Sequence, residues 1–293
     1  MTKKKMSISK KNVLFGWIFV SPFVAGFLLF MALPLFSSLR ISFSKLTNTV
    51  GISEMNFIGF GNYIKAFVGE VSFLSTFTGT VVETLVYTPL VVIFSLIIAI
   101  MINKKIKFKG LFRCIFFLPF MLGTGYILSM LVELGVTGKS MALGDSVMIS
   151  TNQISSMIGP ELTGLVMNFM SAISLILWKS GVQILLFLSG LQGISRSLYE
   201  SAKCDSANEW EMFWKITLPM ISPLVLLTIV YTIIDYFTDI NNSVVKYFTY
   251  YAFTGSMYEY ASAVSWIYFA FIAILLALVF LFMRRAVFYS SEK

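Results

Sequence analysis

The 293-residue chain contains no histidine and only two cysteines, Cys114 and Cys204. The commonest protein metal ligand is therefore missing, the cysteines have no metal-binding spacing, and nucleophile triads that depend on histidine are excluded. No phosphate-binding GxxxxGK[ST] loop occurs either. We therefore expect no catalytic residue, no metal site and no cofactor in this chain, and any nucleotide hydrolysis must be carried out by a partner.

Charge is also scarce. Charged residues make up 12% of the chain and hydrophobic residues 57%, with a mean hydropathy of +0.84, which leaves too little polar surface to coat a soluble globule. The net charge is +8, and the basic residues cluster beside apolar blocks. A nucleic-acid binder needs basic residues interleaved with polar surface, so this arrangement argues against a nucleic-acid partner. Lipid is the solvent that this composition predicts.

The apolar residues form long blocks, each of about the length that a helix needs to cross about 30 Å of hydrocarbon. A β-barrel would instead show short alternating segments. These blocks predict an all-α polytopic membrane protein with about six transmembrane helices. They are Val13–Phe36, Thr80–Ile102, Leu111–Leu134, Leu165–Leu191, Ile216–Phe237 and Ala263–Met283.

The distribution of lysine and arginine predicts the orientation. Positive residues accumulate on the cytoplasmic side of membrane proteins, and here they gather at the N-terminus, in the 103–113 and 192–215 links and at the C-terminus. Both termini and both cysteines are therefore expected on the cytoplasmic side. The 37–79 link is then external, and its aromatic residues between Phe57 and Phe67 predict an interfacial amphipathic segment.

The polar segment from Gly193 to Pro223 carries the most information about function. Two Ser-x-x-Glu patterns, Ser197 with Glu200 and Ser206 with Glu209, predict capping boxes at two helix starts. They indicate one helix, a break near Asp205 and Ser206, and a second helix.

The second of these helices carries an aromatic stripe. Trp210, Phe213 and Trp214 have the spacing i, i+3, i+4 and therefore share one helix face. Two interpretations remain open on spacing alone: the stripe lies against lipid headgroups, or it supports a helix that docks into another protein.

The same segment resembles the signature loop of binding-protein-dependent ABC importer permeases, E-A-A-x-x-x-G followed by I-x-L-P. The ending matches in full, whereas Ser201 replaces the second family residue and Ser206 replaces the glycine at the break. We expect Ser206 to keep the bend by N-capping. The matching stretches are Glu200-Ser201-Ala202-Lys203-Cys204-Asp205-Ser206 and Ile216-Thr217-Leu218-Pro219.

Further stretches resemble the carbohydrate-uptake branch of that family, and its MalF-like component more than its MalG-like one. They are WIFVSPFVAGFLLFMALPL, NFIGFGNYIKAF, FRCIFFLPF and YEYASAVSWIYF, in that order along the chain. The apolar blocks and the charge distribution predict a cytoplasmic N-terminal tail (1–12), a first membrane helix (13–36), an external segment (37–79) and a cytoplasmic tail (286–293). The resemblance implies that residues 80–285 form a five-helix permease core that includes a coupling loop (193–219).

The resemblance also implies a machine and its partners. A second, MalG-like permease, two cytoplasmic ATPases that bind ATP and Mg, and an extracytoplasmic solute-binding protein would join this chain in a bacterial cytoplasmic membrane. The implied cargo is a sugar or oligosaccharide. Alternatives are an amino-acid or peptide permease of the same class or an ion-coupled secondary carrier; an intramembrane enzyme is disfavoured by the lack of convergent catalytic groups.

Two groups of residues are expected to serve transport. Ionisable side chains are costly inside a membrane helix, so those within the blocks, including Glu83, invite a functional interpretation, although acids near a helix end can also lie at the external interface. Residues expected to couple to the ATPase are Glu200, Ser201, Ala202, Asp205, Ser206, Ile216, Leu218 and Pro219. Candidates for the substrate pathway are Lys179, Tyr231, Asp235, Tyr236 and Asn241.

Overall fold

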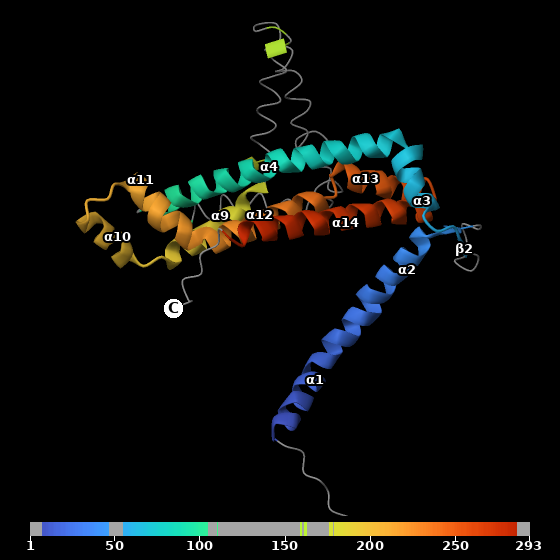
Figure 1. Cartoon of the computed structure of the whole chain (residues 1–293), viewed down its shortest axis with the longest axis horizontal. Helices are drawn as coiled ribbons and strands as arrows, with labels where there is room; N and C mark the ends of the chain where they lie inside the picture. The colour runs from blue at the N-terminus through green and yellow to red at the C-terminus, as the bar shows by residue number, and fades with distance from the viewer. Residues whose placement is uncertain are drawn as a thin grey trace, which may run out of the picture. The chain divides into compact units, whose positions relative to one another are not determined.

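The computed structural model of the chain describes residues 8–46, 55–104, 110, 159, 161–162, 176–177 and 179–285. Helices dominate this part of the chain (Figure 1), which confirms the all-α prediction. Its strands form one short antiparallel pair, β1 (Ser44–Leu46) and β2 (Met55–Phe57), with Lys45 opposite Asn56.

The helical elements follow the order of the predicted blocks. Within the described residues the α-helices are α1 (Ile8–Phe27), α2 (Leu33–Ser42), α3 (Gly61–Ile64), α4 (Val71–Asn103), α9 (Gly181–Gly193), α10 (Arg196–Cys204), α11 (Glu209–Met212), α12 (Leu218–Thr238), α13 (Ser243–Thr249) and α14 (Tyr258–Met283). The same described residues contain four π-helical segments: η1 (Leu28–Ala32), η2 (Lys65–Gly69), η3 (Phe213–Thr217) and η4 (Tyr250–Thr254).

Four helical stretches in the described residues are long and apolar enough to cross a membrane. They are Phe15–Ser42, Val71–Asn103, Glu209–Thr254 and Tyr258–Met283, and they overlap the first, second, fifth and sixth predicted blocks. The third block lies outside the described residues, and the fourth is described mainly through α9. The chain is therefore polytopic, and the count of six remains a prediction.

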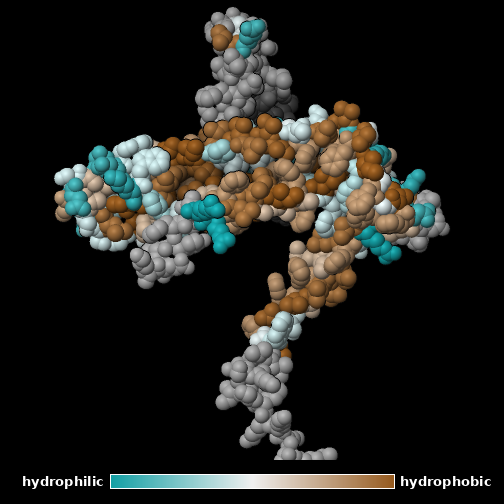
Figure 2. All heavy atoms as spheres, in the orientation of Figure 1, coloured by the Kyte–Doolittle hydropathy of each residue, from teal (hydrophilic) through white to brown (hydrophobic). Residues whose placement is uncertain are grey.

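Helix α4 begins at Val71 and so extends into the segment expected to be external. Residues 71–79 contain neither proline nor charge, so nothing in them ends the helix before the apolar block. At 33 residues α4 is about 50 Å long, well beyond the roughly 30 Å of hydrocarbon. Hydrophobic residues cover this helix, whereas hydrophilic ones gather over α10 and α11 (Figure 2).

Two of the π-helical segments precede a Leu-Pro pair. The N–H of Leu33 donates to the carbonyl of Leu28, and that of Leu218 donates to the carbonyl of Phe213. Proline has no N–H to donate to the carbonyl four residues earlier, and the wider turn occurs directly before each proline. The helix therefore continues through both pairs without a break.

The chain divides into two compact units, residues 1–80 with 239–273 and residues 81–238 with 274–293. The first has a core around Phe73, Tyr260 and Val264. Within it, the buried Asn62 side chain donates to the backbone carbonyls of Ser42 and Ser44, both at 2.9 Å. These bonds fix the end of α2 against α3.

The second unit is built around α9. Its core joins buried residues of α4, α9 and α12, including Ala99, Phe187 and Ile221. Helices α9 and α12 approach closely at Gly190, because a Cβ there would overlap Cδ1 of Leu224. Glycine thus permits the tight contact between these two helices, as small residues do in membrane proteins.

Candidate functional site

The loop between α9 and α12 contains two short helices that meet at a turn. Helix α10 ends at Cys204, residues 205 and 206 turn, and α11 begins at Glu209. This arrangement confirms the predicted helix, break and second helix. The I-x-L-P ending lies in η3 and in the first residues of α12, so the loop passes into α12 as continuous helix.

The predicted capping boxes are wrong in position. Helix α10 has Ser195 at its N-cap without a side-chain capping bond, since the Ser195 hydroxyl instead pairs with that of Ser197 at 2.7 Å. Helix α11 has its capping box on Asn208, whose side chain accepts from the N–H of Glu211 while the Glu211 carboxylate accepts from the N–H of Asn208. Asparagine caps as well as serine does, and here it stands directly before the helix.

Ser206 makes the bend by another route than expected. Its φ is +61°, the left-handed conformation that glycine adopts without strain. The N–H of Ala207 donates to the carbonyl of Ala202 and that of Ser206 to the carbonyl of Lys203, both at 3.0 Å. These two bonds are the Schellman pattern that ends many helices. Ser206 therefore closes α10 as its left-handed C-terminal residue and does not N-cap α11.

The expected coupling residues divide into two groups. Glu200, Ser201, Asp205 and Ser206 are exposed on α10 and its turn, with Ala202 half-buried among them. Ile216, Leu218 and Pro219 are half-buried where the loop continues into α12. The first group is thus available to a partner, and the second links it to a membrane helix.

The aromatic stripe stays on the surface. Trp210 and Trp214 are 69% and 49% exposed, and their rings meet edge to face at 5.5 Å with Phe213 beside them. The stripe is therefore free to contact lipid or another protein, and both interpretations of it remain open.

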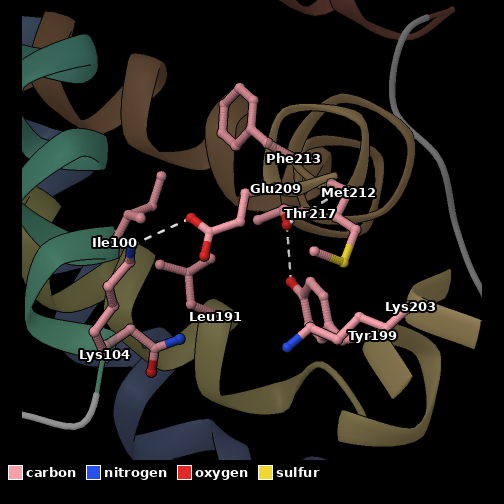
Figure 3. Close-up of a pocket in the computed structure, with 10 residues that line it drawn as sticks. Ile100, Lys104, Leu191, Tyr199, Lys203, Glu209, Met212, Phe213 and Thr217 are labelled. Atoms are coloured by element: carbon pink, nitrogen blue, oxygen red, sulfur yellow. Dashed lines mark hydrogen bonds and ion pairs between the residues drawn. The ribbon is translucent and has the colours of Figure 1, made fainter. Parts of the chain in front are cut away.

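A cleft of about 280 Å³ lies beneath the loop, where α10, α11 and η3 face the ends of α4 and α9 (Figure 3). Lys104 and Glu209 point toward each other across it, with 3.4 Å between Nζ and Oε2. Tyr199 and Thr217 also line the cleft, and their hydroxyls are 2.8 Å apart. That bond connects α10 to η3.

Polar contacts also join α9 and α12 at the end away from the loop. Nζ of Lys179, just before α9, lies 3.0 Å from Oδ2 of Asp235 on α12. One turn further along, Gln183 donates to the hydroxyl of Thr232 at 3.2 Å. Together with the Gly190 contact and the Tyr199 bond, these interactions hold the two helices and the loop as one hairpin.

The substrate-pathway candidates are brought together in part. Tyr231, Asp235 and Tyr236 lie on the last two turns of α12, and Lys179 pairs with Asp235. Asn241 lies in the other unit, in the turn after α12, where its N–H donates to Asp239.

From α4 the sequence interpretation considered Glu83 but passed over Tyr87. The Tyr236 hydroxyl donates to Oε2 of Glu83 at 2.7 Å, and the Tyr236 ring stacks on Tyr87 with centroids 6.1 Å apart. Tyr87 follows Glu83 by four residues, one helical turn. That spacing is the signal by which Tyr87 could have been found.

Comparisons with known proteins identify the family of this chain. The family model described as binding-protein-dependent transport system inner membrane component matches residues 58–289. The lactose transport system permease protein LacF of Rhizobium radiobacter is 32% identical over 78% of this chain and 74% of its own length. The multiple sugar-binding transport system permease protein MsmF of Streptococcus mutans is 30% identical over 90% of this chain and 93% of its own.

A solved structure shares the fold. A chain of a bacterial ABC transporter involved in the import of the acidic polysaccharide alginate superposes with a TM-score of 0.62 at 18% identity, and the match covers 95% of this chain and 99% of that one. With the family model matching most of the sequence, this chain belongs to the family of inner membrane components of binding-protein-dependent transport systems.

Proposed function

We propose that this chain is one of two permease subunits of an ATP-driven, binding-protein-dependent importer of a sugar or oligosaccharide. Family membership supports the transporter class. The sugar cargo is supported by the relatives named for lactose and for multiple sugars. The solute-binding protein, the second permease and the two ATPases that bind ATP and Mg are the partners that this function requires.

The exposed face of α10 is the main support for coupling to an ATPase. Glu200, Ser201 and Asp205 are exposed on a helix that stands outside the apolar segments. A short helix with exposed carboxylates suits a cleft with basic or amide groups on an ATPase, where charge pairs fix orientation and partner choice. Ala202 allows close approach because its side chain is small.

Movement of a docked α10 would be transmitted directly to the membrane helices α9 and α12. Four contacts hold α9, α12 and the loop as one hairpin, namely those of Lys179, Gln183, Gly190 and Tyr199. Packed elements move as rigid bodies because their interfaces do not deform continuously. Closure of the ATPases would therefore tilt α9 and α12 together and open or close the pathway.

The proposed contact with cargo is the polar cluster at the other end of the hairpin, which comprises Lys179, Asp235, Tyr236, Glu83 and Tyr87. Its carboxylates can accept hydrogen bonds from sugar hydroxyls, and its tyrosine hydroxyls can donate or accept them. The stacked rings of Tyr87 and Tyr236 offer an apolar face. The internal pairing of Lys179 with Asp235 lowers the cost of keeping both charges at this depth. With both termini and the loop in the cytoplasm, this cluster faces the external side.

Replacing Glu200 with lysine tests the coupling. A like charge at a docking interface costs several kcal/mol, so Glu200→Lys is expected to lower uptake by about tenfold or more and to abolish the stimulation of ATP hydrolysis by loaded binding protein. The measurements are uptake and ATPase activity of the reconstituted complex.

Glu200→Asp is the matched control, because it keeps the carboxylate and is expected to retain most activity. Both variants are expected at wild-type levels in the membrane, since Glu200 is exposed and outside both cores. Normal stimulated ATPase activity in Glu200→Lys would refute docking through this face.

A further inference from the structure

The cleft beneath the loop is separate from the proposed docking face. Helix α10 presents Tyr199 and Lys203, one turn apart, to the cleft. The exposed docking residues Glu200, Ser201 and Asp205 do not line it. Coupling to an ATPase therefore leaves the cleft without an assigned role.

The cleft lies where apolar helix gives way to charge. Ile100 on α4 and Leu191 on α9 line one part of it, close to the ends of these two apolar helices, while Asn103, Lys104 and Lys203 line another. Such a change from hydrocarbon-lined to polar surface within one small cavity is the environment of a lipid headgroup region.

Positive charge prevails in the cleft. Two lysines, Lys104 and Lys203, and one acid, Glu209, line it. The Lys104–Glu209 pair is open, with 66% and 84% of the two side chains exposed, and exposed pairs of this kind are weak and exchangeable. In the sequence Lys104 also begins the basic run Lys104, Lys105, Lys107 and Lys109.

Aromatic side chains border the same cavity. Phe213 lines it, and the exposed rings of Trp210 and Trp214 lie against Phe213. Tryptophan is enriched at the membrane–water interface because its ring is apolar and its N–H is polar. A site at the membrane–water interface would account for these exposed rings.

We propose that this cleft binds the headgroup of an anionic phospholipid from the surrounding bilayer. Lys104 and Lys203 donate to the phosphate, and Lys104 exchanges its weak contact with Glu209 for it. The apolar side chains of Ile100, Leu191 and Met212 lie against the glycerol end of the acyl chains. Basic pockets between membrane helices at the bilayer surface favour anionic lipid for this reason.

The test measures which lipid the full chain retains. The protein is reconstituted in nanodiscs of equal parts phosphatidylglycerol and phosphatidylcholine with the same acyl chains, extracted gently, and analysed for bound lipid by native mass spectrometry. Enrichment of phosphatidylglycerol is expected in the wild type, and the double variant Lys104→Gln, Lys203→Gln is expected to lower it about tenfold, because each basic residue near the surface contributes a several-fold preference.

Two controls separate this site from general surface charge. Lys215 is an exposed lysine of the same loop outside the cleft, so Lys215→Gln is expected to leave the enrichment unchanged. The double variant Lys104→Arg, Lys203→Arg keeps both charges and is expected to retain it.

A third variant tests the acid in the cleft. Glu209→Gln removes the competing carboxylate and is expected to raise the enrichment.

Three results would overturn the proposal. They are equal retention of the two lipids by the wild type, an equal loss in Lys215→Gln and the double glutamine variant, and displacement of the lipid by millimolar inorganic phosphate. The last result would make the cleft a site for free anions. None of these readouts depends on ATPase coupling.

Discussion

At the scale of single residues, Ser206 occupies a backbone position whose conformation suits glycine. The family has glycine where this chain has serine, and the φ of +61° explains that preference, because an L-residue in the left-handed region costs about 1 to 2 kcal/mol. The sequence allowed the bend to be located but not its mechanism. Ser-x-x-Glu and the neighbouring Asn208 offered competing caps, and only the backbone decides between them.

Substitution of Ser206 tests this mechanism. Valine is β-branched and poorly tolerated at positive φ, so Ser206→Val is expected to open the α10–α11 turn and to speed proteolysis of the loop by about tenfold, since cleavage follows the open population. Ser206→Gly should slow it. Limited proteolysis of the membrane-embedded chain measures both effects.

Ser201 provides the control for this pair. It is exposed and lies within α10 at a helical position, so Ser201→Val is expected to change the cleavage rate only slightly. Equal rates in the two valine variants would show that the left-handed position is not what holds the turn.

At the scale of elements, hydrophobicity located the membrane segments but not their ends. Each of the four described spans overlaps a predicted block, because burial in lipid demands long apolar runs. The early start of α4 at Val71 was missed, since the segment before Thr80 is helical without being uniformly apolar. The hydrophobic pattern also did not predict the packing of α9 on α12, because the need for glycine at position 190 follows from its contact with Leu224.

A large side chain at Gly190 should break this packing. A methyl group there overlaps only with Cδ1, the end of the flexible Leu224 side chain, so Gly190→Ala is expected to cost about 1 kcal/mol or less. Gly190→Leu has no such escape and is expected to cost about 3 kcal/mol, the upper range for overpacking. Thermal unfolding of the purified chain in detergent measures the difference.

Gly193 is the matched control on the same helix. Nothing lies within 4 Å of the position of its Cβ, so Gly193→Leu is expected to leave the melting temperature nearly unchanged. If the Gly190→Leu and Gly193→Leu variants have the same melting temperature, the close approach of α9 and α12 contributes little to the stability of the hairpin.

At the scale of the whole molecule, the class of the protein was predicted more fully from the sequence than the residues of the polar cluster were. Composition predicted a polytopic membrane protein, and the signature around Glu200 predicted the family to which the chain belongs. The polar cluster was predicted only in part. Lys179, Asp235 and Tyr236 stood out as polar groups in apolar blocks, whereas the contribution of Tyr87 depends on how α4 meets α12.

The proposed coupling requires that the α10 loop lies inside the cell, within reach of the ATPases. Cys204 is exposed on that loop, and a Cys114→Ser variant leaves it as the only thiol of the chain. A membrane-impermeant thiol reagent applied to sealed vesicles of each orientation measures its side directly. Labelling in inside-out vesicles alone, reduced when ATPase subunits are added, is the predicted result; labelling in right-side-out vesicles would contradict it.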